Sequence, residues 1–190
     1  MARPESRSSV GPDTGDLLLV AAGDTAAIQR LLRRWRSPVY DVFEKSREPA
    51  DAVEAAAAVF EKLLRSASRY DPATPFEECL WSLVAREAER APRTSIPSIP
   101  PPRLKESAAA RAALVRAAVG ALPPGERSAF LLIRVARLSL PLAAKAAGTS
   151  EVELRRRLVR ALTALSETLA PLFAPREAEA EVTAAPGSTP

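Results

Sequence analysis

A proline-rich stretch near the middle of the chain most restricts what this sequence can fold into. Residues 91–107 read APRTSIPSIPPPRLKES and hold five prolines. Proline lacks the backbone N–H that helices and sheets use, so this segment favours an extended linker. We therefore expect two small helical domains, at 13–91 and 107–172, joined by a Pro-rich linker at 92–106. The acidic, small-residue-rich end, 173–190, predicts a disordered tail.

Composition excludes several kinds of catalytic site. The chain has no histidine and a single cysteine, Cys79. These counts exclude a serine–histidine triad, a histidine-ligated metal, a disulfide framework and a zinc site built from cysteines. With 18 prolines, 7 glycines and 5% aromatic residues, the sequence favours helices with aliphatic cores. We expect an all-α protein that is not an enzyme and that has no metal, cofactor or small-molecule substrate.

The modest net charge of +4 conceals an uneven distribution. Residues 13–93 carry 12 basic and 14 acidic side chains, a net charge of −2, whereas residues 127–160 carry 8 basic and 2 acidic ones, a net charge of +6. A concentrated basic segment is the electrostatic pattern expected of a nucleic-acid-binding module. A charge run alone is more often a solvated helix face, so the prediction needs a motif beside it.

Nothing in the sequence predicts insertion into a membrane. The first residues lack the apolar run of a signal peptide, and no stretch of about 18 apolar residues occurs. We therefore expect a cytoplasmic protein.

Helical spacing of apolar residues predicts four helices in the first block. Asp24 is a suitable N-cap for the second helix and Asp51 for the third. Pro38 is expected to restart or kink the second helix. Trp81 lies at helical spacing with other apolar residues and is expected in the core, as is Cys79. The predicted elements are helices at 13–22, 24–43, 51–64 and 76–90, with a loop at 69–75.

The second block ends in a helix–turn–helix pattern. Helices are predicted at 108–120, 125–137 and 139–147, followed by a last helix from Ser150. Ala144 is small where two helices cross, Gly148 suits a turn that needs positive φ, and Leu154 anchors the second helix. Ser150–Glu153 matches a capping box, S-x-x-E. Leu154, Leu158 and Leu162 are expected on the core face.

The remaining faces of this last helix are basic, as in a helix that reads the major groove. Such helices present N-terminal residues to base edges and flanking residues to phosphates. The alternative is an ordinary αα-hairpin with a solvated arginine face. The residue spacing, the capping box and the local positive charge all favour DNA binding instead. The candidate duplex-binding residues are Lys145, Ser150, Glu151, Glu153, Arg155, Arg156, Arg157 and Arg160.

Five segments together resemble the extracytoplasmic-function (ECF) sigma factors of the sigma-70 family. The first, 16–32, is similar to the D-x-x-L start of the family. ALPPGER (121–127) is similar to the L-P-x-x-x-R entry of the family's σ4 domain, and LSLPLAAKAAGTSEVELRRRLVRALTAL (138–165) to its promoter-binding segment. ADAVEAAAAVFEKLL (50–64) resembles the helix that grips the β′ clamp helices of RNA polymerase, and CLWSLVAREAERAPR (79–93) resembles the −10 element reader. The resemblance implies a σ2-like domain followed by a σ4-like domain.

The resemblance also implies partners and sites. The partners would be core RNA polymerase, through its β′ clamp helices and β flap, promoter DNA at the −10 and −35 elements, and an anti-sigma factor. Tyr70, in the loop, is the candidate for stacking on a base. The implied −10 residues are Arg69, Tyr70, Arg86, Arg90 and Arg93. The implied polymerase-binding residues are Asp51, Glu54, Ala57, Ala58 and Glu61.

The sequence departs from the family at three places. The clamp-gripping helix carries alanines at 55–58 where the family has acidic residues and a glutamine, so it is divergent. Leu142 replaces a glutamate in the first helix of the helix–turn–helix, and Glu87 replaces an asparagine in the −10 reader. Two other functions stay open: a helix–turn–helix transcriptional regulator, and a degenerate sigma-like interaction protein that does not direct initiation.

Overall fold

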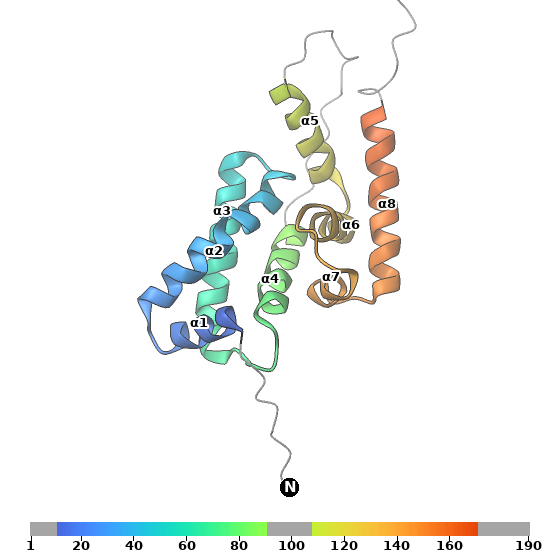
Figure 1. The fold of residues 1–190 in the computed structure, drawn as a ribbon. Coiled ribbons are helices and arrows are strands. Elements are labelled where there is room, and N and C mark those ends of the chain that lie inside the picture. The colour runs from blue at the N-terminus through green and yellow to red at the C-terminus, as the bar shows by residue number, and fades with distance from the viewer. Residues whose placement is uncertain (1–10, 91–107, 171–190) are drawn as a thin grey trace, which may run out of the picture.

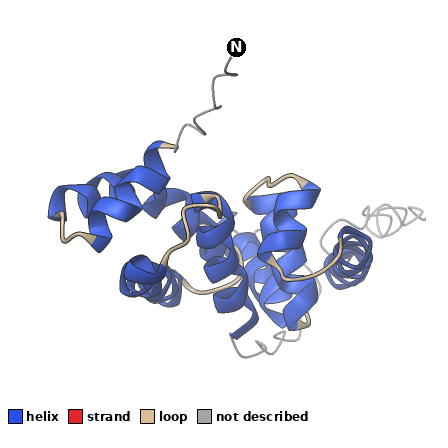
Figure 2. Ribbon diagram, turned by 90° about the horizontal axis from the view of Figure 1, so that it is seen from below, coloured by secondary structure: helices blue, strands red, loops and turns tan. Residues whose placement is uncertain are grey.

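The computed structural model describes residues 11–90 and 108–170, and every regular element within them is a helix (Figure 2). The predicted all-α class is therefore confirmed. The predicted linker and tail lie outside the described residues. No helix in the described ranges is long and apolar enough to cross a bilayer.

The first half contains four α-helices and one 3₁₀ turn. Asp24 caps the second helix as predicted, because its Oδ1 accepts hydrogen bonds from the backbone N–H groups of Ala26, at 2.8 Å, and Ala27, at 3.2 Å. The elements are α1 (Pro12–Ala21), α2 (Thr25–Glu44), α3 (Pro49–Ser66), η1 (Ala67–Arg69) and α4 (Phe76–Arg90).

Helix α2 runs through Pro38 without a restart, and the alternative effect of Pro38, a kink, stays a prediction. The predicted cap of the third helix is wrong. Helix α3 begins at Pro49 with Glu48 as its N-cap residue, so Asp51 lies in the first turn and is not the cap. Proline suits the first helical position because its missing N–H has no partner there in any case.

The second half contains α5 (Ala108–Ala121), α6 (Pro124–Phe130), α7 (Leu140–Ala146) and α8 (Glu151–Leu169), with the π-helical turn η2 (Leu131–Val135) after α6. The helix predicted at 125–137 therefore changes its hydrogen-bonding pattern halfway. The π-helical turn ends at Val135, and Arg137, two residues later, has a φ of 56°, the one positive value among the described non-glycine residues.

The turn of the helix–turn–helix has the predicted geometry. Gly148 has φ 59°, and the backbone N–H groups of Gly148 and Thr149 close α7 by donating to the carbonyls of Lys145 and Ala144, both at 3.0 Å. Ser150 Oγ then accepts from the N–H of Glu153 at 3.2 Å. The two helices consequently meet at a fixed angle set by the turn.

Helix α4 joins the two halves (Figure 1). It packs against α3 on one side and against α6 and α7 on the other. One buried apolar cluster runs from Leu17 in α1 to Leu165 in α8. Polar contacts also join the two halves: Ser128 Oγ donates to Glu89 Oε1 at 2.8 Å, Lys145 Nζ lies 3.4 Å from Glu78 Oε2, and Arg116 Nη2 lies 3.6 Å from Glu48 Oε2.

The aromatic core of the first half also follows the sequence. Trp81 is buried, as predicted, and its ring meets that of Trp35 edge-on with centroids 6.2 Å apart. Cys79 is half-buried against the core, and burial raises the pKa of its thiol. The thiol is therefore a packing group rather than a reactive one.

Two glycines provide a test of the turn. Gly148→Ala should lower the free energy of unfolding by about 1 kcal/mol, because an added Cβ meets nothing within 4 Å and the cost is that of positive φ alone. Gly15→Ala, inside α1 with nothing within 4 Å of its Cβ, should raise it by about 0.5–1 kcal/mol. Urea denaturation measures both. Equal effects of the two changes would contradict the assigned turn.

Candidate functional site

Helix α8 turns one face to the core and the opposite face to solvent. Leu154, Ala161 and Leu165 are buried. The predicted core position of Leu162 is wrong, since this side chain is 38% exposed. A step of four residues advances about 40° round a helix, so the series 154, 158, 162 drifts off the core, whereas a step of seven returns to within about 20°.

Two of the four arginines of α8 are held by carboxylates of the same chain. Glu153 Oε1 accepts from Arg157 Nε at 3.2 Å and from Arg160 Nη2 at 3.4 Å, and Glu126 Oε1 accepts from Arg160 Nε at 2.9 Å. The hydrogen bond from Arg157 lowers the pKa of Glu153, and the one to Glu126 raises the pKa of Arg160. The pair of Arg160 with Glu126 links α8 to α6, whereas the two pairs of Glu153 lie within α8.

The capping-box prediction is therefore half right. Ser150 caps α8, but the Glu153 carboxylate binds Arg157 and Arg160. Arg157 also lies over Gly125, where an added Cβ would approach Arg157 Nη1 to 3.1 Å. Glycine at this position thus leaves room for the arginine.

The other two arginines face solvent. Arg155 and Arg156 are exposed, and neither forms an ion pair among the residues that the structure describes. Val152, 62% exposed, and Val159, 58% exposed, lie on the same side of the helix. Together with Arg160 these four residues line an open hollow along α8. Two of the four arginines predicted for the recognition helix, Arg155 and Arg156, are thus free of ion pairs among the described residues.

The other predicted duplex-binding residues occupy different positions around the turn. Ser150 and Glu151 are exposed at the start of α8, where backbone N–H groups favour an anion. Lys145, on α7, is exposed but its ammonium faces Glu78 of α4. The structure therefore places Lys145 at the junction of the two halves.

A second basic surface lies between the end of α3 and α4. It brings together the predicted Arg69, Arg86 and Arg90, whereas Arg93 lies outside the described residues. Sequence reasoning missed Lys62 and Arg65, although the spacing 62, 65, 69 puts them on one side of the chain. The groove lining is Lys62, Arg65, Ser66, Arg69, Leu83, Arg86 and Arg90.

The loop after η1 extends this groove. Tyr70 lines the adjoining hollow together with Arg69 and Arg86. The Tyr70 hydroxyl donates to the carbonyl of Thr74 at 2.5 Å and lies 3.2 Å from Thr14 Oγ1. The ring is thus held in place beside the basic residues, with its hydroxyl already bonded.

Glu87 is a buried carboxylate at the inner end of the same region. Lys62 Nζ donates to its Oε2 at 2.6 Å, Arg47 Nη1 lies 3.7 Å from its Oε1, and Arg47 Nη2 donates to its backbone carbonyl at 2.6 Å. Burial lowers the pKa of Arg47. Arg90 Nη1 also lies 4.0 Å from Glu87 Oε2. The acidic residue that replaces the family asparagine is therefore matched by three cations, and two of them, Lys62 and Arg90, belong to the basic groove.

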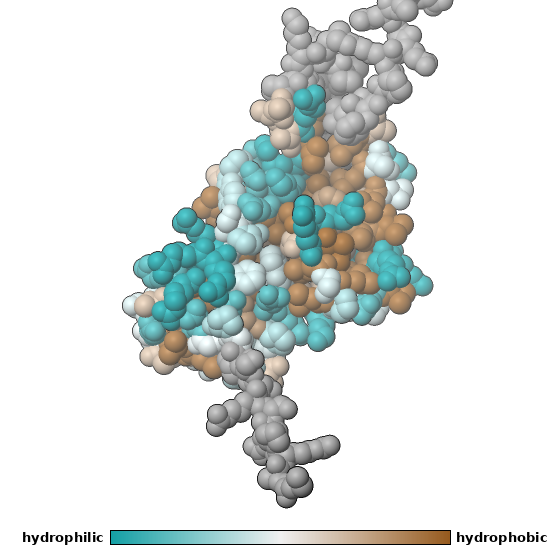
Figure 3. Space-filling view, in the orientation of Figure 1, coloured by the Kyte–Doolittle hydropathy of each residue, from teal (hydrophilic) through white to brown (hydrophobic). Residues whose placement is uncertain are grey.

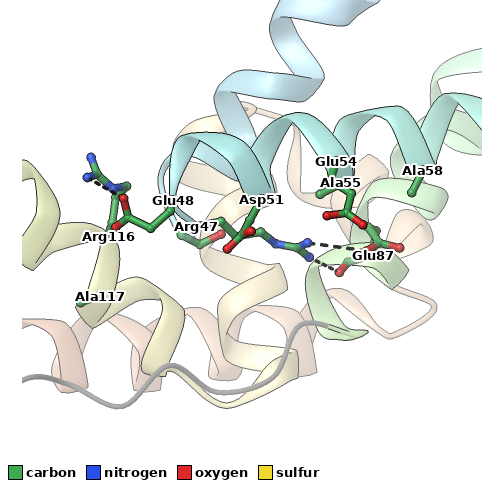
Figure 4. A pocket seen from close by; sticks show the side chains of 10 residues that line it. Arg47, Glu48, Asp51, Glu54, Ala55, Ala58, Glu87, Arg116 and Ala117 are labelled. Atoms are coloured by element: carbon green, nitrogen blue, oxygen red, sulfur yellow. Dashed lines mark hydrogen bonds and ion pairs between the residues drawn. The ribbon is translucent and has the colours of Figure 1, made fainter.

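The predicted polymerase-binding residues share one face of α3. Asp51, Glu54, Ala57 and Glu61 are exposed and Ala58 is half-buried, as their spacing requires. The same face borders a cavity of about 470 Å³ between α3, the end of α4 and α5. Figure 4 shows acidic side chains of α3 above Arg47 and Glu87, with Arg116 of α5 turned to Glu48.

The described residues hold no group of three side chains suited to a metal ion. The functional candidates are therefore surfaces: the outer face of α8, the basic groove between α3 and α4, and the acidic face of α3.

Comparison with known proteins found one family model and a similar solved structure. Residues 112–165, from α5 into α8, match the model of sigma-70, region 4. The described fold is similar to that of CnrH, an ECF sigma factor, in the structure of CnrH in complex with the cytosolic domain of CnrY. The TM-score is 0.65 at 21% identity, and the match covers 83% of this chain and 97% of CnrH. No curated protein matches the sequence.

These findings confirm the resemblance to the ECF sigma factors of the sigma-70 family. The sharper match is to the second half, where sequence and structure agree on region 4. The first half is supported by fold, because at 21% identity the similarity to CnrH is a similarity of architecture.

The Glu87 cluster gives a second prediction. Glu87→Gln should lower the free energy of unfolding by about 2 kcal/mol, because Lys62 and Arg47 lose their buried counter-charge. Glu77→Gln, at an exposed position in the first turn of α4, should change it by less than about 0.5 kcal/mol. Urea denaturation of both variants measures these changes in the free energy of unfolding. A loss at Glu77 as large as that at Glu87 would refute the role of the cluster.

Proposed function

We propose that this protein is a cytoplasmic sigma factor that directs RNA polymerase to specific promoters and performs no catalysis itself. The observation that carries the proposal is the outer face of α8, where Arg155 and Arg156 stand free of ion pairs among the described residues on the recognition helix of a matched sigma-70 region 4. A cationic helix face after a tight turn suits the major groove.

In this proposal the outer face of α8 binds the −35 element and the basic groove binds the −10 element. Helix α8 enters the major groove of the −35 duplex, with Ser150 and Glu151 at its leading end. The groove between α3 and α4 holds the phosphates of the −10 strand, and the Tyr70 loop lies where an unstacked base would be captured. A positive groove beside an aromatic ring is how proteins commonly bind single-stranded DNA.

The polymerase would bind on the remaining surfaces. The acidic face of α3 is the proposed contact for the β′ clamp helices, and the second half is the proposed contact for the β flap. On the side shown in Figure 3, hydrophobic residues gather over the second half, between α4 and α8, while hydrophilic residues predominate over α2. An apolar surface of this kind suits a protein partner.

An anti-sigma factor is the other proposed partner. CnrH, whose fold this chain shares, has been seen in complex with the cytosolic domain of CnrY. By analogy, a protein that covers the apolar surface and the α3 face would keep the polymerase away and hold the factor inactive.

Transcription from purified components tests the proposal. Core polymerase with the full chain, given a pool of genomic fragments, should produce transcripts from discrete start sites that core polymerase alone does not produce. Glu54→Lys, on the acidic face of α3, should reduce co-purification with core polymerase at least about tenfold by reversing a charge at the interface. Asp41→Lys, an exposed carboxylate of α2, is the matched control and should leave co-purification unchanged.

The outcomes separate the alternatives. Binding to core polymerase without new start sites would favour a degenerate sigma-like protein. Failure to bind core polymerase together with binding to duplex DNA would favour a helix–turn–helix regulator. Either result would overturn the proposal.

Duplex binding provides a further prediction for α8. Arg155→Ala and Arg156→Ala should each weaken binding and lower the slope of log affinity against log salt by about 1, because each removes one phosphate contact. Arg33→Ala, an exposed arginine of α2 with no ion pair among the described residues, should change neither. Fluorescence anisotropy at several salt concentrations measures both quantities. An unchanged salt slope in both α8 variants would remove this face as the duplex-binding surface.

A further inference from the structure

Two valines form an apolar ridge at the centre of the outer face of α8. Val152 and Val159 are 62% and 58% exposed. They are seven residues apart, which is about two helical turns, so they lie in line along the axis. The buried Leu154 and Ala161 point roughly the opposite way. The ridge is thus the part of α8 that projects farthest from the core.

Free cations flank this ridge on both sides. At about 100° per residue, Arg155 lies on one side of the line from Val152 to Val159 and Arg156 on the other. Both are exposed, and no ion pair of the described residues engages them. The surface is therefore apolar along its crest and positive along its edges, and one hollow includes all four side chains.

This arrangement is unusual for a face that only meets water. Single exposed valines need no explanation. However, valine is a weaker helix former than the lysine, glutamate or alanine that solvent-facing positions usually carry. Two valines at the crest of one helix, between unpaired arginines, indicate a partner that is apolar at its centre and negatively charged on either side.

We propose that Val152 and Val159 read the C5-methyl groups of thymines in the −35 duplex, an inference that rests on the proposed function. The thymine methyl is the apolar group that the bases present in the major groove, where all other groups are hydrogen-bond donors or acceptors. Phosphates line both edges of the groove, and Arg155 and Arg156 would neutralise them from either side of the valines. The surface thus complements a thymine-containing major groove in both polarity and charge.

Val152 is the principal reader of the two. It is the second residue of α8, and recognition helices contact base edges through their N-terminal residues. Val159 lies about 10 Å farther along the axis. A helix that runs along the groove therefore brings the two valines to thymines about three base pairs apart.

Removal of single methyl groups from DNA tests the inference. The wild-type full chain selects its best duplexes from a randomised pool, and each thymine of the selected duplex is then replaced in turn by deoxyuridine, which lacks only the C5-methyl. One replacement should weaken wild-type binding about fourfold, the value of one buried methyl group. Val152→Ala should show the same loss on the thymine duplex and no further loss on the deoxyuridine duplex.

Two variants make the test specific. Val159→Ala should cancel the effect of a second thymine, about three base pairs from the first. Val53→Ala, a change of the same type at a 59% exposed position of α3, should keep the full sensitivity to deoxyuridine. Because all three valines are exposed, the substitutions leave the core intact.

Each outcome bears on the inference. Equal affinity for thymine and deoxyuridine duplexes, or equal sensitivity of wild type and Val152→Ala, overturns methyl reading while duplex binding itself stands. Selection of no duplex overturns the proposed −35 binding as well. A shift of the wild type to dimer that Val152→Ala abolishes would assign the ridge to a second copy of the chain and overturn the inference.

Discussion

The packing of α4 between the two halves is the constraint on which the rest of the structure depends. Leu80, Trp81 and Val84 are buried, and the helix meets α3 on one side and α6 and α7 on the other. Its remaining side carries Arg86 and Arg90 into the basic groove. A helix buried on two sides has little freedom to turn, so the groove and the helix–turn–helix are held in a fixed relation to each other.

Carboxylates decide which cations this molecule can offer to a partner. Glu153 and Glu126 engage Arg157 and Arg160, and Glu87 engages Lys62. Among the exposed arginines without an ion pair in the described residues, Arg155 and Arg156 lie on the outer face of α8, and Arg69 and Arg86 line the groove. An arginine held by a partly buried carboxylate fixes one helix against another, whereas a free one can neutralise a phosphate. The same residue type thus has a structural role at one position and a binding role three or four residues away.

Local features of the structure could be predicted from the sequence, and long-range ones could not. Asp24, Gly148 and Ser150 act within a few residues of their own positions, and their capping and turn roles follow from side-chain chemistry alone. The pairing of Arg160 with Glu126 joins residues 34 apart, and that of Lys62 with Glu87 joins residues 25 apart. Such contacts arise from packing between elements, about which helical periodicity carries no information.

In the proposed complex with the −35 duplex, affinity and specificity come from different side chains of α8. Arginine–phosphate contacts are strong, long-ranged and nearly independent of sequence, so Arg155 and Arg156 by themselves would bind any duplex. Apolar contacts are weak and short-ranged. A valine nevertheless gains binding free energy from contact with a thymine methyl, whereas beside a cytosine or guanine it leaves polar groups of the base without a hydrogen-bond partner. Val152 and Val159 project farthest from the core of the protein. Arg155 and Arg156 can therefore approach the phosphates fully only where the two valines fit against the base edges in the groove. The weak valine contacts would therefore make the strong arginine–phosphate binding depend on the base sequence of the duplex.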